Sequence, residues 1–260
     1  MFINNFDPVA IQIFSFEIRW YSLAYIIGIL LGWVLSKKIF IKNLEINKKF
    51  DDYISYLIIG IIVGGRLGYI IFYNFNYYLN NILDIFKIWE GGMSFHGGLI
   101  GVICASIVFA KKNKQDYFLY TDVVALAAPI GIFFGRLANF VNSELYGSPT
   151  EVLWAVTFVQ VDNLSRHPSQ LYEAVLEGII LFLILIYFRK KNYLEIPGLI
   201  SALFLILYSI FRFIVEFFRV PDEQLGYLIL SLSMGQIISL IFIIFGIILF
   251  YVKNENKQIN

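Results

Sequence analysis

Residues 197–217 read PGLISALFLILYSIFRFIVEF, an apolar run in which only Arg212 and Glu216 are charged. About 20 apolar residues in a helix cross the hydrocarbon core of a bilayer, so this run predicts a membrane-spanning helix. Similar runs recur along the chain. Of the 260 residues, 59% are hydrophobic, whereas a soluble domain is about 45–50% apolar. The sequence therefore predicts an integral membrane protein.

Seven runs are long enough to span, and we predict an all-α, polytopic membrane protein with seven transmembrane helices. Backbone exposed to lipid must satisfy its own hydrogen bonds. The runs also lack the alternation of apolar and polar residues found in membrane β-barrel strands. A single integral membrane domain over residues 1–260 is the simplest organisation. The predicted spans are 20–40, 52–74, 94–111, 120–141, 169–188, 197–217 and 229–252.

The basic residues between these spans give the orientation. The loops after the first, third and fifth spans and the C-terminal tail are rich in lysine and arginine, whereas the alternate loops hold one basic residue each: Lys87, Arg166 and Arg219. Because basic loops stay in the cytoplasm, we expect the N-terminus outside and the C-terminus in the cytoplasm.

Two segments are expected to lie outside the membrane on the N-terminal side. The loop 142–168 forms a small extracytoplasmic cap, and its segment Val152–Val161 is rich in β-branched and aromatic residues, which predicts a strand pair. The segment Val9–Phe16 is too short and too mixed to span. We expect it to lie along the outer surface as an interfacial arm.

Composition argues against several classes of site. The formal net charge is +1, and no basic domain or aromatic–basic motif favours nucleic acid as a partner. The single cysteine, Cys104, excludes an internal disulfide. Two histidines, His96 and His167, do not supply the usual zinc ligands. We expect no metal and no cofactor.

Three arginines lie inside otherwise apolar stretches: Arg66, Arg136 and Arg212. A charge at the centre of a membrane helix costs about 2.5–3.5 kcal/mol on insertion scales. The helices can be oriented so that all three arginines lie near the outer face, which predicts a site built for an anion. At that depth the abundant anion is a phospholipid phosphate. The residues expected at the same level are Tyr21, His96, Asn139, Glu144, Tyr208 and Glu216.

Spacing places some of these residues together. Tyr208, Arg212 and Glu216 are four residues apart and share one helix face, as do Arg136 and Asn139 at a spacing of three. Arg212 and Glu216 could equally form an ion pair with a purely structural role. Glycines in the same regions let helices approach closely and leave room for a bulky ligand; they include Gly64, Gly65, Gly97, Gly98, Gly101 and Gly135.

Five motifs together resemble the bacterial prolipoprotein diacylglyceryl transferases. The resemblance covers nearly the whole chain, in order and with similar spacing. Two departures touch no charged residue of the expected site: the loop 148–165 is shorter than in some members, and Ala138 stands where glycine is also found. The motifs are MSFHGGLIG at 93–101, GRLANFVNSELYG at 135–147, RHPSQLYE at 166–173, FRFIVEFFR at 211–219 and SMGQ at 233–236.

The resemblance implies a reaction. The diacylglyceryl group of phosphatidylglycerol is transferred to the lipobox cysteine thiol in the signal peptide of a prolipoprotein. The products are a thioether and glycerol 1-phosphate. The implied location is the bacterial cytoplasmic (inner) membrane, multi-pass, with the active site toward the extracytoplasmic side. The implied partners are membrane lipid and the prolipoprotein.

Roles within that reaction follow as hypotheses. Arg136 and Arg212 hold the lipid phosphate, since a guanidinium binds two phosphate oxygens and stays protonated. His96 is the candidate base for the thiol, or it only orients the substrate; the sequence leaves both open. The remaining assignments are head-group orientation by Asn139 and Tyr21, arginine support by Glu144 and Glu216, substrate binding by Tyr208, and either phosphate binding or counter-ion duty for Arg66.

Two other functions compete with this one. In an intramembrane serine protease, Ser94 lies two residues from His96. That placement suits a catalytic dyad poorly, and a protease would not need several arginines. A transporter for an anion or lipid predicts polar residues through both membrane halves or broken helices at mid-depth. Here the polar residues are confined to the outer half.

Overall fold

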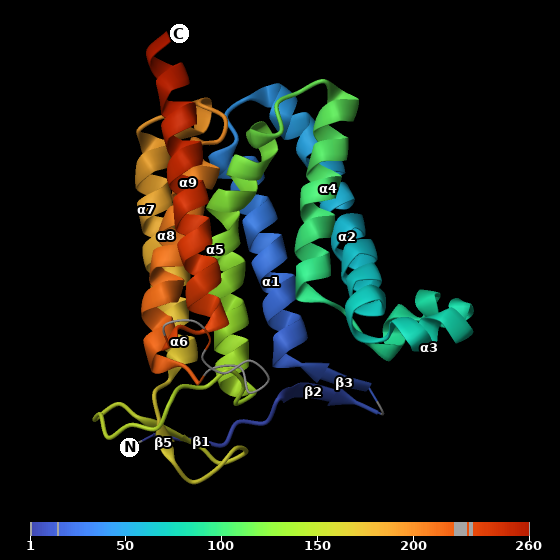
Figure 1. Ribbon diagram of the computed structural model, residues 1–260, viewed down its shortest axis with the longest axis vertical. Helices are drawn as coiled ribbons and strands as arrows, with labels where there is room; N and C mark the ends of the chain where they lie inside the picture. Colours follow the sequence, from blue (N-terminus) through green and yellow to red (C-terminus); the bar gives the residue numbers. More distant parts are fainter. Residues whose placement is uncertain (1, 15, 221–227, 229–230, 260) are drawn as a thin grey trace. The chain divides into compact units, whose positions relative to one another are not determined.

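The computed structural model describes residues 2–14, 16–220, 228 and 231–259 (Figure 1). The chain divides into two compact units, Met1–Phe40 with Asp122–Asn260, and Ile41–Thr121. Most described residues are helical, as predicted. Six helices are long and apolar enough to cross a membrane: Trp20–Phe40, Leu44–Tyr73, Phe118–Val141, Ser169–Lys190, Leu199–Phe218 and Met234–Glu255.

These six helices correspond to six of the seven predicted spans. The remaining prediction, 94–111, forms helix α4 (Phe95–Asn113), but it does not reach the same apolarity among the described residues. Its glycines and its terminal Lys111 and Lys112 lower the hydropathy. A mostly helical, multi-pass membrane protein is thus confirmed, while the count of seven spans and the orientation stay predictions.

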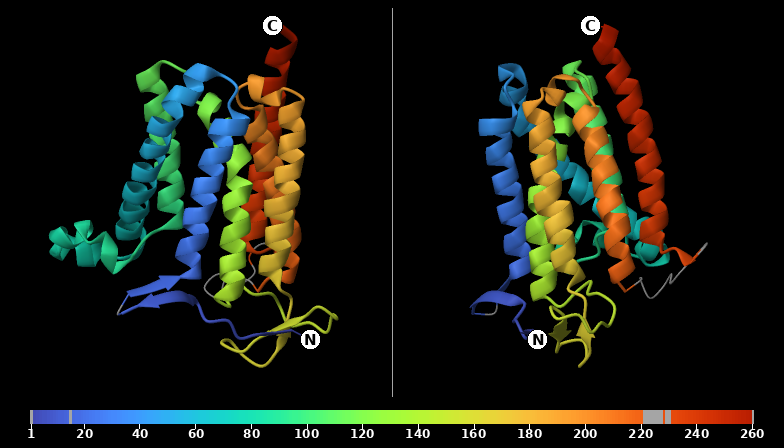
Figure 2. Two further views of the ribbon diagram at one scale, coloured as in Figure 1. Left: turned by 180° about the vertical axis from the view of Figure 1, so that it is seen from behind. Right: turned by 90° about the vertical axis from the view of Figure 1, so that its left-hand side faces the viewer.

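The first unit holds a group of long helices that run side by side in Figures 1 and 2. Its core is made by fully buried aliphatic side chains, among them Leu126, Leu181, Leu185 and Ile200. The helices are α1 (Trp20–Leu35) with the π-helical turn η1 (Ser36–Phe40), α5 (Phe118–Val141), α6 (Ser169–Glu173), the π-helical η4 (Ala174–Ile180), α7 (Leu181–Lys190), η5 (Tyr193–Glu195), α8 (Leu199–Val215), η6 (Glu216–Phe218) and α9 (Met234–Ile259).

Side chains cap the ends of these helices. Asp122 of α5 is 1% exposed. It accepts hydrogen bonds from the main-chain N–H groups of Gly198 and Ser201, at 2.7 and 2.8 Å, at the start of α8. These N–H groups have no acceptor within their own helix. Near the C-terminal end of α7, Arg189 donates to the carbonyls of Ile39 and Phe40 in η1.

Short strands lie outside the helices and qualify the all-α prediction. β1 (Phe2–Asn4) pairs in parallel with β4 (Val156–Phe158), which pairs antiparallel with β5 (Ser165–Arg166). The expected strand pair within Val152–Val161 is therefore wrong, because its one strand takes both partners from elsewhere. β2 (Val9–Ile13) and β3 (Phe16–Arg19) form an antiparallel hairpin.

The second unit is a helical hairpin of α2 (Leu44–Tyr73) and α4, joined through α3 (Phe75–Asn80), η2 (Ile82–Phe86) and η3 (Ile88–Glu90). Glycines at the crossing let the two backbones touch, as the sequence predicted. A Cβ built on Gly64 would lie 2.4 Å from the Gly97 carbonyl oxygen, and one on Gly101 only 1.9 Å from that of Gly60. Such small-residue contacts hold helices together where lipid supplies no hydrophobic driving force.

Candidate functional site

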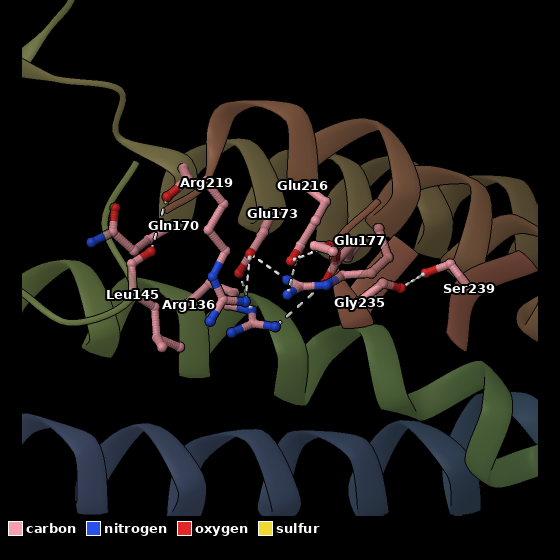
Figure 3. A network of polar contacts seen from close by, with 12 residues as sticks. Arg136, Leu145, Gln170, Glu173, Glu177, Glu216, Arg219, Gly235 and Ser239 are labelled. Atoms are coloured by element: carbon pink, nitrogen blue, oxygen red, sulfur yellow. Dashed lines mark hydrogen bonds and ion pairs between the residues drawn. The ribbon is translucent and has the colours of Figure 1, made fainter. Parts of the chain in front are cut away.

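Glu173 joins two of the predicted arginines in the first unit (Figure 3). Arg136 of α5 places its Nε 2.7 Å from one carboxylate oxygen of Glu173. Arg212 of α8 donates from Nη1 to the other oxygen at 2.5 Å. Glu173 is fully buried, and the side chains of Arg136 and Arg212 are 19% and 13% exposed. Arg136 and Arg212, which the sequence predicted at one site, thus contact the same carboxylate, and their role toward a substrate stays a prediction.

Further charged residues complete this cluster. Arg212 contacts Glu216 at 2.8 Å from Nη2. The fully buried Glu177 lies 3.7 Å from Nη2 of Arg136, and Arg219 lies 3.8 Å from Glu173. We call these six residues, Arg136, Arg212, Arg219, Glu173, Glu177 and Glu216, the arginine–glutamate cluster. Its three guanidinium groups and three carboxylates give a formal charge of zero.

The start of α9 is shaped around Glu216. The Ser233 hydroxyl donates to Oε1 of Glu216 at 3.0 Å. It also accepts from the N–H of Gln236 at 3.2 Å, while the Gln236 side chain accepts from the Ser233 N–H at 3.0 Å, which is a reciprocal helix cap. A Cβ on Gly235 would lie 2.8 Å from the same carboxylate oxygen. The motif at 233–236 thus holds Glu216 and leaves space for it.

Two acids of the cluster, Glu173 and Glu177, lie where an α-helix continues as a π-helix. Glu173 ends α6 and Glu177 lies within the π-helical η4. Single π-helical turns inside α-helices occur frequently at functional sites. One turn earlier, Gln170 donates to the Glu144 carbonyl at 2.6 Å and Ser169 to that of Leu145 at 2.9 Å. The motif 166–173 therefore carries Glu173 and also anchors the end of the motif 135–147.

Gly147 shows how tightly these motifs meet. A Cβ at this position would lie 2.4 Å from the His167 carbonyl oxygen and 2.5 Å from that of Phe218. The Gly147 N–H donates to the first of these at 2.9 Å. Only glycine fits between these two main-chain segments without displacing them. Three separate motifs are thereby brought to the same end of the first unit.

Asn139 and Glu144 pair with each other. The Asn139 side chain donates to the Glu144 carboxylate at 3.1 Å, and the Glu144 N–H donates to the Asn139 carbonyl at 2.9 Å. The sequence predicted that Glu144 supports an arginine. In the part of the chain that the structure describes, Glu144 makes no ion pair with an arginine. The carboxylates beside Arg136 come instead from Glu173 and Glu177.

The two tyrosines of the predicted site lie in the first unit. Tyr208 is one turn before Arg212 on α8, and its ring stacks on Phe204. Glu177, Arg136 and Arg212 all act on it electrostatically. The Tyr21 hydroxyl lies 3.2 Å from that of Tyr25, at the start of α1.

Arg66 belongs to the second unit and is 5% exposed. Its five N–H donors all have main-chain carbonyl partners between Asp84 and Gly92: Nε donates to Ile85, Nη1 to Gly91 and Gly92, and Nη2 to Asp84 and Lys87. A guanidinium has five donors, so this one is fully engaged. Arg66 holds the connection between α3 and α4 in place.

His96 is exposed near the start of α4, in the second unit. Ser94 precedes it as the helix cap, buried, with its hydroxyl accepting from the Gly97 N–H at 3.3 Å. This capping role accounts for the serine without any catalytic dyad.

The cap segment contains one strong ion pair outside the spans. Arg166 donates to both carboxylate oxygens of Asp162 and stacks over Tyr146, with 4.8 Å between guanidinium and ring. The Arg166 hydrogen bonds, helped by the Leu164 N–H, hold the pKa of Asp162 below its ordinary value. Burial lowers the pKa of His167, whose Nδ1 lies 3.1 Å from the Tyr172 hydroxyl.

Sequence reasoning left Glu173, Glu177 and Arg219 out of the site. A usable signal was present, because Glu173 and Glu177 are the only charged residues in the predicted span 169–188. A buried carboxylate needs a partner as much as a buried arginine does. Matching the unpaired acids to the unpaired arginines would have found the cluster.

Comparison with known proteins places this multi-pass helical membrane protein in a class. The chain matches the model of a family described as prolipoprotein diacylglyceryl transferase over residues 8–252. Similar proteins are named phosphatidylglycerol–prolipoprotein diacylglyceryl transferase. The one from Rickettsia bellii (strain OSU 85-389) is 48% identical, covering 100% of this chain and 99% of its own. The one from Rhodospirillum rubrum is 47% identical, covering 97% and 94%. The chain belongs to the prolipoprotein diacylglyceryl transferase family.

Proposed function

We propose that this protein transfers the diacylglyceryl group of phosphatidylglycerol to the lipobox cysteine thiol of prolipoproteins, with a thioether and glycerol 1-phosphate as products. The observation that carries the proposal is the buried pair Arg136 and Arg212 joined through Glu173. Relatives that match nearly the full length of the chain bear the name of this reaction. Neither a protease nor a transporter has comparable support.

The two arginines differ in how firmly they are held. Arg212 is engaged at both ends of its guanidinium, by Glu173 and by Glu216. Among the described residues, Arg136 makes its one close ionic contact through Nε, and its Nη2 meets only Glu177, at 3.7 Å. We therefore propose that the Arg136 guanidinium binds the lipid phosphate directly. Arg212 is a fixed positive charge beside it.

The chemistry requires stabilisation of a leaving group. The thiol sulfur attacks the glyceryl carbon, the bond from that carbon to the phosphate ester oxygen breaks, and its electron pair stays on the phosphate. Positive charge fixed where this negative charge grows lowers the barrier, and removing one such donor costs on the order of 10²–10³ in rate. The thiol has a reference pKa near 8.5, so a base or a cationic field raises its reactive fraction.

The other predicted residues take supporting roles in this proposal. His96 removes the thiol proton or orients the substrate. The paired Asn139 and Glu144, together with Tyr21 and Tyr208, contact the head group. Glu216 supports Arg212. Arg66, with every donor engaged, orders its loop instead of binding phosphate.

Location follows from the same reading. The enzyme lies in the bacterial cytoplasmic (inner) membrane with seven spans, its N-terminus and active site toward the extracytoplasmic side. Residues 142–168 form a cap there, above the membrane domain. The lipid and the prolipoprotein signal peptide are its substrates.

The test compares arginine variants in purified form. Labelled phosphatidylglycerol and a lipobox peptide are incubated with Arg136→Ala, Arg212→Ala and, as a matched control, Arg19→Ala, whose side chain is 61% exposed. The first two should lose about 10²–10³ in rate, and the control should keep its rate. Near-normal transfer by both cluster variants would end the proposal.

His96 is tested separately through pH. If it is the base, His96→Gln should lower the rate and also change how the rate depends on pH. A lower rate with an unchanged pH profile would assign it to orientation, and an unchanged rate would remove it from the site.

A further inference from the structure

Glu177 is the least supported charge in the arginine–glutamate cluster. Its side chain is fully buried. Neither of its carboxylate oxygens has a hydrogen-bond partner among the residues that the structure describes. Its closest cation, Nη2 of Arg136, is 3.7 Å away. A buried carboxylate that accepts no hydrogen bond is more easily protonated than one that does, because protonation costs it no such contact.

The other two acids of the cluster are held differently. Glu173 accepts a hydrogen bond from Arg212 at 2.5 Å and lies 2.7 Å from Nε of Arg136. Glu216 accepts from Ser233 at 3.0 Å and lies 2.8 Å from Nη2 of Arg212. Protonating either acid would weaken these contacts. Protonating Glu177 disturbs only one long ion pair in the described part of the chain.

Charge balance gives this difference a consequence. The cluster is formally neutral, and it is buried. Adding an anionic phosphodiester would leave one uncompensated negative charge, which is costly where the surroundings are apolar. One proton restores neutrality, and Glu177 is the carboxylate that accepts it with the smallest loss of contacts.

We propose that Glu177 is a positioning residue that takes up one proton when an anionic phosphate head group binds beside Arg136. The inference rests on the proposed function for the identity of the anion. The groups that face Glu177 are Glu173 of α6, Arg136 of α5, Tyr208 and Arg212 of α8, and Arg219 after η6. Tyrosine and arginine have reference pKa values of about 10 and above 12, so neither takes up this proton near neutral pH.

The test measures binding, with no thiol substrate present. Short-chain phosphatidylglycerol is titrated by calorimetry into the purified full-length protein between about pH 6 and about pH 9. Its phosphodiester keeps one negative charge throughout this range. If one proton accompanies binding, wild-type affinity should fall by about tenfold per pH unit at the upper end. Calorimetry in buffers of different ionisation enthalpy should then give an uptake of about one proton.

Two variants isolate the group responsible. Glu177→Gln keeps the shape and removes the titration, so its affinity should be independent of pH, with no proton uptake. Glu151→Gln is the matched control, because Glu151 is exposed in the cap, and it should behave as the wild type. The same pH dependence in Glu177→Gln and in the wild type would overturn the inference, as would a wild type with no uptake.

If Glu177→Gln does not fold, infrared difference spectroscopy of the wild type still tests the inference directly. In the wild type, infrared difference spectra should gain the C=O stretch of a protonated carboxylic acid when the lipid binds. Glu177→Asp should shift the frequency of that band. A wild-type difference spectrum without the band would refute the inference. Lipid binding without transfer to a lipobox peptide would instead refute the proposed function. Transfer with pH-independent binding would refute only the role of Glu177.

Discussion

The contact between α2 and α4 makes a sharp prediction for Gly101→Ala. A Cβ on Gly101 would lie 1.9 Å from the Gly60 carbonyl oxygen, whereas ordinary contact begins near 3.4 Å. The two helices must therefore part by about 1.5 Å at this point. A gap of 0.5–1 Å already forfeits roughly a quarter to a half of a dispersion contact. We expect a packing loss at or above the upper end of the usual 1–3 kcal/mol for overpacked sites.

Gly98→Ala is the matched control on the same helix. Its Cβ would lie 3.8 Å from the Ile61 carbonyl oxygen, which is an ordinary contact distance. Both variants gain the same preference of alanine over glycine in a helix, about 1 kcal/mol, so their difference isolates the packing loss. Each kcal/mol corresponds to about 2–4 °C in melting temperature for a protein of this size.

The assay is helix melting, followed by circular dichroism in one detergent for wild type, Gly98→Ala and Gly101→Ala. Gly98→Ala should melt at or slightly above the wild-type temperature, and Gly101→Ala roughly 6–12 °C below Gly98→Ala. Equal melting temperatures for the two variants would show that α2 and α4 do not pack through these glycines.

Three further predictions concern other contacts. Arg66→Lys leaves at least two main-chain carbonyls without a donor, at about 1–3 kcal/mol each, and should speed proteolysis between residues 75 and 92; cleavage at the wild-type rate would contradict this role. Asp122→Asn, which retains one of two acceptor oxygens at the start of α8, should destabilise the protein by about 1–2 kcal/mol in thermal melts, and an unchanged melt would exclude the cap. The Asp162 carboxyl has a lowered pKa because it bonds to Arg166. Its stabilising effect is therefore complete above its unfolded pKa of about 3.9 and is lost as pH falls through the folded value. The protection of the cap against amide hydrogen exchange, taken relative to the unfolded chain at the same pH, should fall with acid in the wild type, and by more than in Asp162→Asn.

Local features of the sequence carried most of the fold. Apolar runs of spanning length predicted the long helices, because a lipid environment leaves few other ways to satisfy the backbone. The pairing of β1 with β4 had no such signal, since Phe2 and Val156 are far apart in the chain and neither strand is long. The π-helical turn at Ala174–Ile180 likewise has no sequence pattern that distinguishes it from an α-helix.

The sequence predicted the kind of site but not all of the residues that form it. Insertion cost pointed to Arg136 and Arg212, and spacing pointed to Glu216. The same reasoning assigned Arg66 to the site, but it did not predict that the carbonyls between Asp84 and Gly92 take up the Arg66 donors, because spacing says nothing about which carbonyls a loop will turn inward. Glu173, the residue that joins the two arginines, required attention to acids as well as to cations.

The five carbonyls around Arg66 determine when, during synthesis of the chain, helix α2 can reach its final position in the membrane. Its nearest partner lies 18 residues downstream and its farthest 26. While the ribosome is still making that connection, α2 presents a bare guanidinium to the insertion machinery. Only when Gly92 has emerged and the loop has turned back can the helix settle with its charge covered. Truncation before this point should leave α2 poorly inserted, although every residue of the helix itself is present.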